Sequence, residues 1–332
     1  MKYLKVRRED AESVRRKLLE KSSLDKSKAV ERDGEYVMFP LLSTVKIPGT
    51  EVVEAEGRIK TKRPASLAES LSGILSADEL EALPSSFNVI GDIVVLEPEG
   101  IPIDKMRLVG EAFLRTFRNI KVVALKVEQV SGEYRVPQVK VIAGEKRTET
   151  IHREHGCVYK LDIAKAYFSP RLGSERLRVV NQIHDGERVL VMFAGVGPYA
   201  ILAAKLSGAE VTAIELNPIA VEYMRWNILR NKVNVNVIEG DVREKVPALG
   251  LFDRIIMPLP KQADTFLDVA FSCLKKDGVI HYYTFARNTL EATGHLAEAV
   301  GSLGVKAEIL DVVLCGSYSP RISRLCVDFK VL

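Results

Sequence analysis

The second half of the chain alternates short apolar runs with longer segments that carry apolar residues at helical spacing. Short runs rich in Val and Ile are typical of buried strands, and apolar residues three and four apart are typical of helices. Strands that alternate with helices favour a parallel sheet. The expected strands are 188–192, 211–214, 235–238, 254–257 and 278–283, with a late pair at 307–315 and 325–331. The expected helices are 199–206, 218–231 and 265–274.

The first half has a different pattern, with more alternation and more turns. Residues 1–60 are expected to form strand, helix, strand and strand, where Asp10 caps a helix with Val14 and Leu18 on its apolar face. The basic stretch 58–64 lacks apolar periodicity and is interpreted as a linker. An α+β segment follows, with expected helices 67–83 and 106–117 and strands 87–96, 122–127, 139–142 and 148–154. The pattern therefore predicts three domains, residues 1–60, 65–158 and 159–332.

Composition narrows the class of protein. The 332 residues are 47% hydrophobic and 28% charged, which is typical of a globular protein. The chain has no run of 18 apolar residues, and its charged N-terminus lacks a secretory signal, so we expect no membrane association. None of the four cysteines (Cys157, Cys273, Cys315 and Cys326) lies in a C-x-x-C pair. We therefore expect no metal site and a reducing, cytoplasmic location.

Charge is distributed unevenly along the chain. Residues 1–65 contain 16 Lys and Arg against 11 Asp and Glu, a net charge of +5, whereas the remainder carries −1. Residues 1–65, the first predicted domain with the basic stretch that follows it, thus hold the whole basic excess, which suggests a polyanionic partner. A solvated charged surface explains the charge equally well.

A nucleotide-binding pattern follows the first strand of the second half. Gly195 and Gly197 permit a tight turn, and let backbone approach a ligand where a helix begins. Glu215 follows the next strand, where a carboxylate can accept the hydroxyls of a ribose, and Asp241 follows the third. The turn also fits the dinucleotide pattern G-x-G-x-x-A. S-adenosylmethionine fits better, because Pro198 has no N–H for a pyrophosphate and the late strand pair suits a class I methyltransferase.

Three runs carry a family resemblance: YFSPRLGSER at 167–176, MFAGVGP at 192–198 and GVIHYY at 278–283. They resemble the archaeal and eukaryotic tRNA (guanine(37)-N1)-methyltransferases, with further matches at 90–93, 132–135, 143–145 and 318–321. The resemblance implies a Rossmann-like class I methyltransferase domain with a mostly parallel seven-stranded sheet, preceded by α+β domains. It also implies an enzyme that binds tRNA and methylates N1 of guanosine 37 with S-adenosylmethionine, after the base is flipped out. No obligate protein partner is evident from the sequence, so a monomer is expected.

The resemblance assigns roles to individual residues. Neutral guanine carries a proton on N1, so a base must remove it, and Glu175 matches the family's general base. Arg135 matches the arginine that stabilises negative charge at O6. Plausible tRNA contacts are Lys146, Arg147 and Arg171. His281, Tyr282 and Tyr283 are interpreted as packing residues of a strand. The residues expected to bind the donor are Tyr167, Arg176, Phe193, Gly195, Gly197, Glu215, Leu216, Asp241, Val242, Pro258 and Pro260.

Two departures from the family pattern keep alternatives open. Val191 stands where the family usually has Asp, and Pro258 stands where it usually has Asn. Proline offers neither a side-chain donor nor an N–H, so donor affinity or target choice could differ. The alternatives are a wyosine-pathway tRNA methyltransferase or aminocarboxypropyltransferase, and a tRNA-binding homologue with weakened catalysis. A dehydrogenase is a more distant alternative. The aminocarboxypropyltransferases usually lack the extra N-terminal domain, so residues 1–60 argue against that reading.

Overall fold

Two separate units make up the chain, Met1–Pro64 and Ala65–Leu332. The computed structural model describes residues 1–57, 66–83, 87–97, 101–131, 136–319 and 321–332, without the side chains of 128–131 and 137. The unit boundary agrees with the expected linker near residue 60. The further division of the second unit at residue 158 stays a prediction.

The first unit is a four-stranded sheet covered by one helix. Its elements are β1 (Lys2–Arg7), α1 (Ala11–Glu20), β2 (Glu31–Asp33), β3 (Tyr36–Pro40) and β4 (Glu51–Glu54), with strand order β2-β3-β1-β4. Val14 and Leu18 of the helix are buried against Leu4, Val6 and Phe39 of the strands. The expected order of elements is confirmed, and β2 is an additional short strand that the sequence did not predict.

The next segment is an α+β layer. The prediction of one long helix at its start is wrong. Residues 67–83 form two short helices, because Gly73 adopts φ +80° and Ser76 starts a new helix with a capping box to Glu79. The elements are α2 (Leu67–Leu71), α3 (Ala77–Glu81), β5 (Asn88–Ile90), β6 (Ile93–Leu96), α4 (Met106–Thr116), β7 (Val122–Ser131) and β8 (Val136–Gly144). The strands form a sheet of order β5-β6-β7-β8, in which β6 and β7 are parallel.

A hairpin and a short helical segment precede the large sheet. The hairpin is β9 (Glu149–Glu154) and β10 (Cys157–Asp162), of which β10 was not predicted. The turn η1 (Pro170–Leu172) then runs directly into α5 (Gly173–Val180). Within the same unit, the β5–β6 turn packs on β9, where a side chain at Gly91 would collide with Thr150. This contact joins the α+β layer to the segment that leads into α5.

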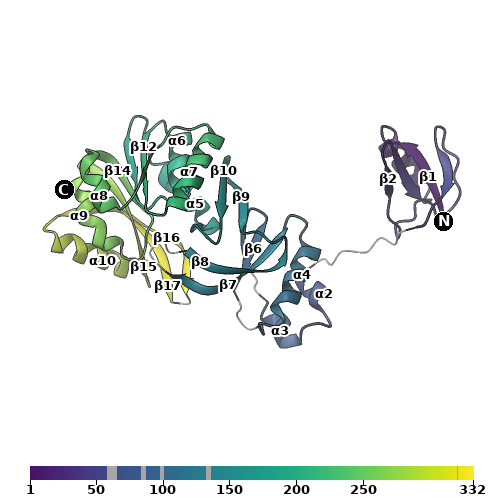
Figure 1. Ribbon diagram of the computed structural model, residues 1–332, viewed down its shortest axis with the longest axis horizontal. Helices are drawn as coiled ribbons and strands as arrows, with labels where there is room; N and C mark the ends of the chain where they lie inside the picture. The colour runs from purple at the N-terminus through teal and green to yellow at the C-terminus, as the bar shows by residue number, and fades with distance from the viewer. Residues whose placement is uncertain (58–65, 84–86, 98–100, 132–135, 320) are drawn as a thin grey trace. The chain divides into compact units, whose positions relative to one another are not determined.

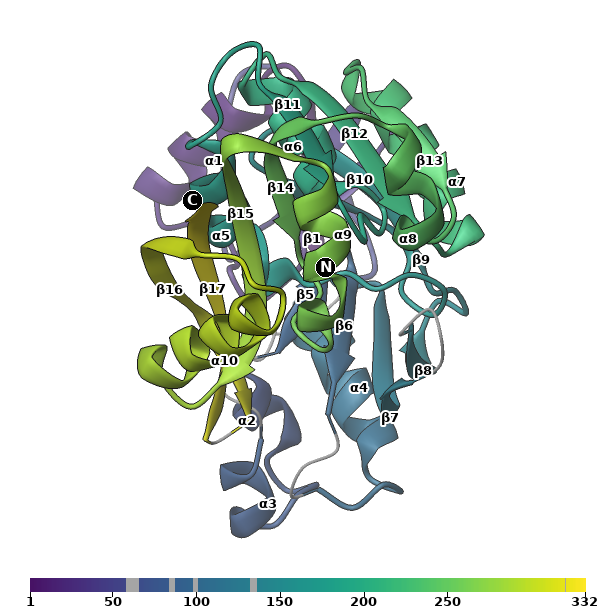
Figure 2. The same cartoon turned by 90° about the vertical axis from the view of Figure 1, so that its left-hand side faces the viewer.

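The second half forms the predicted seven-stranded sheet. In sheet order the strands are β13 (Asn236–Glu239), β12 (Glu210–Glu215), β11 (Arg188–Val191), β14 (Phe252–Met257), β15 (Leu274–Ala286), β17 (Ile322–Val331) and β16 (Ala307–Ser319). The first five are parallel, β17 runs antiparallel to β15, and β16 runs antiparallel to β17 (Figure 2). The Rossmann-like α/β fold class is confirmed. The late pair is antiparallel within itself, and only β17 runs against the five parallel strands.

Helices cover both faces of this sheet (Figure 1). One face packs against α5, α6 (Pro198–Leu206) and α7 (Pro218–Asn231), and the other packs against α8 (Val242–Lys245), α9 (Leu267–Ser272) and α10 (Thr289–Ser302). Neighbouring residues on β11 point to opposite faces, so Val189 and Val191 lie in the first core and Leu190 in the second. Alternation along single strands thus builds two cores.

Some helices differ from the expected ones. The helix expected at 265–274 is replaced by two shorter elements, η3 (Ala263–Phe266) and α9, and Leu274 already begins β15. Helix α10 was not predicted. The short η2 (Val246–Ala248) follows α8. Within the described ranges, none of the helices is both long enough and apolar enough to cross a lipid bilayer.

Candidate active site

The loop between β11 and α6 is a tight glycine turn at the carboxyl end of the sheet. Gly195 has φ +57° and Gly197 has φ +87°, both in the left-handed region. A side chain at Gly197 would also lie 2.8 Å from Cγ of Met224. Only glycine fits position 197 without strain. Because Gly197 is the N-cap of α6, the turn places the N-terminal end of this helix at the sheet edge.

Glu215 closes this loop from the neighbouring strand. Its Oε2 accepts the N–H of Gly195 at 2.7 Å, and its Oε1 accepts the N–H of Asn217 at 2.8 Å. Burial raises the pKa of Glu215, although these backbone hydrogen bonds oppose the shift. A carboxylate has about four acceptor positions, so Glu215 can hold the loop and still accept the hydroxyls of a ribose.

The next strand ends beside an aromatic pair. Asp241 occupies the N-cap of α8 and accepts the N–H of Arg243 at 2.8 Å. Phe193 packs edge-on against Phe266, with ring centroids 4.8 Å apart, and Arg243 lies 3.7 Å from the Phe266 centroid. Val242 is buried and Leu216 is half-buried. The edge thus offers an acid and apolar surfaces, which fit an adenosine group.

The two departures from the family pattern lie in different places. Val191 is fully buried in the core, so it forms part of the packing between the sheet and its helices. Pro258 and Pro260 follow β14 and are half-buried at the carboxyl edge of the sheet. Position 258 therefore belongs to the same edge as the glycine turn, and its missing amide is a real change in the chemistry of that edge.

Tyr167 lies next to the glycine turn. Its carbonyl oxygen would be 3.6 Å from a side chain placed on Gly195. Its ring is 40% exposed, and its hydroxyl accepts a hydrogen bond from Arg324 of β17 at 3.1 Å. The same arginine lies over Phe285, which stacks on Tyr318 with centroids 4.1 Å apart. An arginine and partly exposed aromatic rings therefore flank the edge.

Glu175 is buried, with only 6% of its surface exposed. Arg178 donates to both of its oxygens, from Nε to Oε2 and from Nη2 to Oε1, each at 2.8 Å. Tyr283 of β15 also donates to Oε1, at 2.7 Å. Tyr283 is bonded to Tyr199 in the first turn of α6, at 2.7 Å. The candidate base is thus tied to the helix that begins at the glycine turn.

Arg176 is almost fully buried and already has a partner. It donates from Nε and Nη2 to the two oxygens of Glu154, each at 2.6 Å, and from Nη2 to the carbonyl oxygen of Ser169. Burial raises the pKa of Glu154, but bonds from His152 and Arg176 outweigh it and hold that pKa at about 2. The assignment of Arg176 as a donor-binding residue stays a prediction. In the structure Arg176 forms an internal ion pair with Glu154.

The residues predicted to contact tRNA are dispersed. Arg147 pairs bidentately with Asp92, and it lines a cavity of about 610 Å³ with Arg153 and Lys160. Lys146 and Arg171 are exposed on the surface. Arg135, the second predicted catalytic residue, lies outside the described residues. These assignments all stay predictions.

Except for Arg176, the predicted donor residues lie at or beside the carboxyl edge of the sheet, and their role in donor binding stays a prediction. Sequence reasoning assigned Tyr283 to packing, and it missed Arg178 and Asp328, which bond to Glu175 or to its partner. A burial pattern cannot reveal a phenol that bonds to a carboxylate 108 positions away. The available signal was Asp328, an acid between the apolar residues Val327 and Phe329.

Family models match three consecutive parts of the chain. Residues 4–48 match the tRNA methyltransferase 5 N-terminal domain, residues 67–148 the TYW2 N-terminal domain, and residues 150–306 the TRM5/TYW2 methyltransferase domain. The tRNA (guanine(37)-N(1))-methyltransferase Trm5b of Pyrococcus abyssi is 42% identical over 99% of this chain and 98% of its own length. The chain belongs to the TRM5/TYW2 methyltransferase family. The resemblance inferred from the three sequence runs is therefore confirmed.

Solved structures agree with this membership. The complex structure of aTrm5 and tRNALeu is similar, with a TM-score of 0.73 and 34% identity over 99% of both chains. The crystal structure of Methanocaldococcus jannaschii TYW2 in complex with AdoMet has a TM-score of 0.56 and 30% identity. It covers 74% of this chain but 100% of its own length. The TYW2 structure therefore leaves a quarter of this chain unmatched, whereas the Trm5 structure spans nearly all of it.

Proposed function

We propose that this protein transfers a methyl group from S-adenosylmethionine to N1 of guanosine 37 in tRNA. The observation that carries the proposal is the match along the whole chain to a tRNA (guanine(37)-N(1))-methyltransferase, including the Trm5-type N-terminal domain. The basic excess of residues 1–65 supports tRNA as the partner, because nucleic-acid affinity depends strongly on Lys and Arg contacts to phosphates.

The residues at the sheet edge suit this donor. Glu215 would bind the ribose of the donor, the Gly195–Gly197 turn would let backbone approach it, and Asp241 would lie near its adenine. S-adenosylmethionine supplies a methyl group on a positively charged sulfur. One chain supplies all of these groups, which is consistent with the predicted monomer. The monomeric state and the cytoplasmic location stay predictions from the sequence.

Glu175 would act as the general base. N1 of neutral guanine carries a proton and has no free lone pair, so the N1–H bond must break as the new N1–methyl bond forms. The carboxylate of Glu175 would take that proton, and Arg135 would stabilise the negative charge at O6. Positioning of nucleophile and methyl group in line would supply much of the remaining rate.

Pro258 is the observation that favours a second candidate, a wyosine-pathway transferase. Loss of the asparagine amide would alter recognition of the target base if position 258 faces it, and a tricyclic base derived from guanosine is a larger substrate than guanine. The shorter TYW2 structure, which leaves a quarter of this chain unmatched, argues for the first candidate.

Mass spectrometry of nucleosides would test the proposal. An unmodified tRNA transcript with guanosine at position 37 is incubated with the protein and S-adenosylmethionine, then digested to nucleosides. We expect 1-methylguanosine, and a second transcript with adenosine at 37 should gain no methyl group. An aminocarboxypropyl adduct, or transfer only to a tricyclic base, would support the second candidate. No product from any of these substrates, with donor binding absent, would favour a tRNA-binding homologue.

A further inference from the structure

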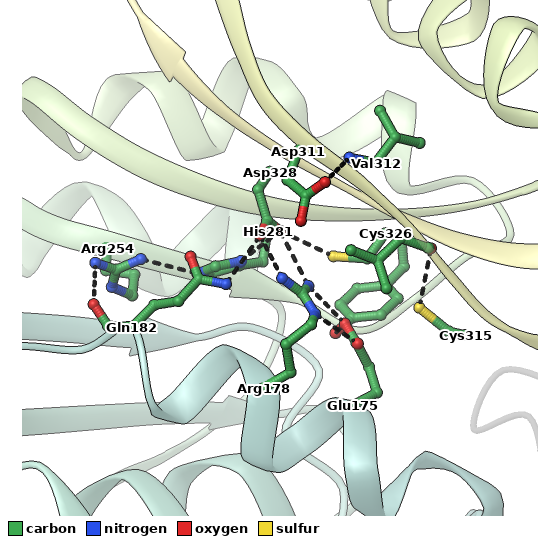
Figure 3. A network of polar contacts seen from close by, with 12 residues as sticks. Glu175, Arg178, Gln182, Arg254, His281, Asp311, Val312, Cys315, Cys326 and Asp328 are labelled. Atoms are coloured by element: carbon green, nitrogen blue, oxygen red, sulfur yellow. Dashed lines mark hydrogen bonds and ion pairs between the residues drawn. The ribbon is translucent and has the colours of Figure 1, made fainter.

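A chain of polar groups extends from Glu175 across β17, β15 and β14 to Arg254 (Figure 3). Arg178 lies between two carboxylates, because it donates to Glu175 and also, from Nη1, to Oδ2 of Asp328 at 2.6 Å. His281 continues the chain, with Nδ1 2.6 Å from Oδ1 of Asp328. Arg254 comes next and pairs with Glu187 at 2.8 Å. None of the assignments made from the sequence uses Arg178 or Asp328.

Asp328 is held in place by hydrogen bonds from several side chains of this network. It is 1% exposed and lies directly opposite His281 in the β15–β17 ladder. Gln182 donates to its Oδ2 at 3.1 Å, and the thiol of Cys326 donates to its Oδ1 at 3.2 Å, in addition to the bonds from Arg178 and His281. Burial raises the pKa of Asp328, but the bonds from His281 and Arg178 outweigh it and hold that pKa well below its usual range. Asp328 therefore stays ionised.

His281 is neutral in this arrangement. Nη1 of Arg254 lies 3.0 Å from Nε2 of His281, and a guanidinium can only donate, so Nε2 accepts. The ring proton is then on Nδ1 and is donated to Asp328. Burial lowers the pKa of His281, in the same direction. His281, Cys326 and Asp328 have ligand types that metals use, but their neighbours Arg254 and Arg178 are cations, which makes the cluster a hydrogen-bond network.

The network has one more carboxylate than it has guanidinium groups. Glu175, Asp328 and Glu187 contribute three negative charges, and Arg178 and Arg254 contribute two positive charges, so these connected residues carry one net negative charge. Arg254 and Glu187 balance one another. The excess negative charge therefore lies around Arg178, because its single guanidinium is shared by Glu175 and Asp328.

Uncharged groups complete the surroundings of Glu175. Tyr283 of β15 and Tyr199 of α6 face it, as do the thiols of Cys315 on β16 and Cys326 on β17. Burial raises the pKa of each of these four groups, so they are neutral near pH 7.

Two other arginines lie near these neutral groups, and each has a partner of its own. The positive charge of Arg176 opposes the rise in the pKa of Tyr199, and Arg176 is paired with Glu154. The positive charge of Arg324 likewise opposes the rise in the pKa of Cys315, and Arg324 is hydrogen-bonded to Tyr167. Among the residues that the structure describes, the charges that bond Glu175 or its partner directly are therefore Arg178 and Asp328.

We propose that Arg178 and Asp328 are positioning residues: Arg178 orients Glu175, and Asp328 shares this arginine, so that Glu175 stays basic enough to take the N1 proton. This inference rests on the proposed function of Glu175. A carboxylate paired with a guanidinium of its own is a weak base, because the ion pair favours the charged form. Asp328 draws part of the guanidinium charge away from Glu175 and holds the arginine in place. When Glu175 takes the proton, the connected network becomes neutral.

The proton and electron pairs balance in this step. The N1–H bond breaks and an O–H bond forms on Glu175, while the sulfur–methyl bond breaks and the N1–methyl bond forms. The positive charge of the sulfonium and the negative charge of Glu175 both disappear. The burial of Glu175 favours this outcome, because a neutral acid is less costly to bury than a carboxylate.

The pH dependence of single-turnover methyl transfer tests the inference. A base-catalysed step slows once its base is protonated, so we expect the rate of the wild-type protein to fall at acidic pH. Asp328→Asn leaves Arg178 to Glu175 alone, so we expect this acidic limb to move to lower pH by about one unit. The plateau rate should fall a few-fold because the base is weaker. Asp253→Asn is the matched control, since Asp253 pairs with Lys275 and touches neither Glu175 nor Arg178.

Arg178→Gln provides a second variant, which decides the matter if Asp328→Asn does not fold. The side chain of Arg178 is 23% exposed in the wild-type structure, so water can reach the site when the charge of Arg178 is removed. Two neighbouring acids then face each other without a cation, and the acidic limb should move to higher pH. Opposite shifts in the two variants are not expected from a merely structural role. An acidic limb that coincides with the wild-type limb in a folded Asp328→Asn or Arg178→Gln protein would overturn the inference.

Failure of the inference differs from failure of the proposed function. If Glu175→Gln transfers methyl groups at the wild-type rate, Glu175 is not the base, and the proposed mechanism fails together with this inference. If Glu175→Gln is inactive but neither variant shifts the acidic limb, the proposed function stands and only the role of Arg178 and Asp328 is refuted.

Discussion

The phenol of Tyr283 donates its proton to Oε1 of Glu175 across 2.7 Å. Because this donor is used, the oxygen of Tyr283 accepts the hydroxyl proton of Tyr199, also at 2.7 Å. Tyr199 lies one residue into α6, the helix that Gly197 begins. Two phenols thus connect the candidate base to the candidate donor loop, over elements that are far apart in sequence.

Tyr283→Phe removes a hydrogen bond to the charged form of Glu175. A carboxylate that loses a donor becomes more basic, so we expect the acidic limb of the pH–rate profile to move to higher pH. Above that limb, the methyl-transfer rate should stay within about tenfold of wild type. The measurement is single-turnover transfer over a range of pH. Tyr282→Phe, on the opposite face of the same strand, is the control and should leave the profile unchanged. A shift to lower pH would contradict the role assigned to Tyr283.

Glu175→Gln preserves the shape of the side chain and removes its basicity. We expect methyl transfer to fall by about 10²–10⁴-fold, the usual contribution of a general base. Binding of S-adenosylmethionine, measured by calorimetry, should be largely retained, because Glu215 and the glycine turn lie outside α5, the helix that carries Glu175. Circular dichroism would establish that the variant is folded. Transfer at the wild-type rate would remove Glu175 from the mechanism.

Gly197→Ala introduces a methyl group where no room exists. The residue has φ +87°, and the new carbon would lie 2.8 Å from Cγ of Met224. We expect a loss of about 2 kcal/mol in the free energy of unfolding, from backbone strain and overpacking together. Donor affinity should fall about tenfold, which corresponds to about 1.4 kcal/mol.

Gly294→Ala is the control for that substitution. Gly294 lies in α10, and a side chain there would meet nothing within 4 Å. Alanine should stabilise this helix by about 0.5–1 kcal/mol and leave donor binding unchanged. Urea unfolding and calorimetry would measure both quantities. Equal losses in the two variants would mean that the turn at Gly197 has no special constraint.

The buried pair of Glu154 and Arg176 should make stability depend on pH. The pKa of Glu154 is held at about 2, below its ordinary value of 4.5, so its stabilising effect is complete above pH 4.5. The effect is lost as pH falls from 4.5 towards 2. Glu154→Gln should therefore cost about 3 kcal/mol in the free energy of unfolding at neutral pH.

The difference between the wild-type protein and Glu154→Gln should shrink as the solution is acidified. Urea titrations at neutral pH and in steps down to about pH 3 would follow it. A difference that stays constant over this range would show that Glu154 gains no stability from its charge. Glu149→Gln serves as the comparison. Glu149 lies on the same strand as Glu154 and forms a partly exposed ion pair with Lys160 of β10, so its loss should lower the free energy of unfolding by less than about 1 kcal/mol.

Local patterns were sufficient for most of the large sheet. The helix at 218–231 was predicted with its observed bounds, because Asn217 caps it, Pro218 suits its first turn and its apolar residues recur at helical spacing. The long helix expected at 67–83 failed for an equally local reason. Gly73 and the capping box of Ser76 outweighed the apolar spacing on which that prediction depended.

The sequence by itself determined the order of strands and helices, the glycine turn and the acids that follow the strands, since each of these depends on residues close together along the chain. Only the tertiary structure decided which charges meet. Arg178 and Asp328 are 150 positions apart, and they touch because β17 inserts antiparallel beside β15 and places Asp328 opposite His281. Strand order and register are set by packing over the whole sheet, so no local pattern specifies them. The carboxylate at 175 was visible in the sequence, but the groups that control its charge were not.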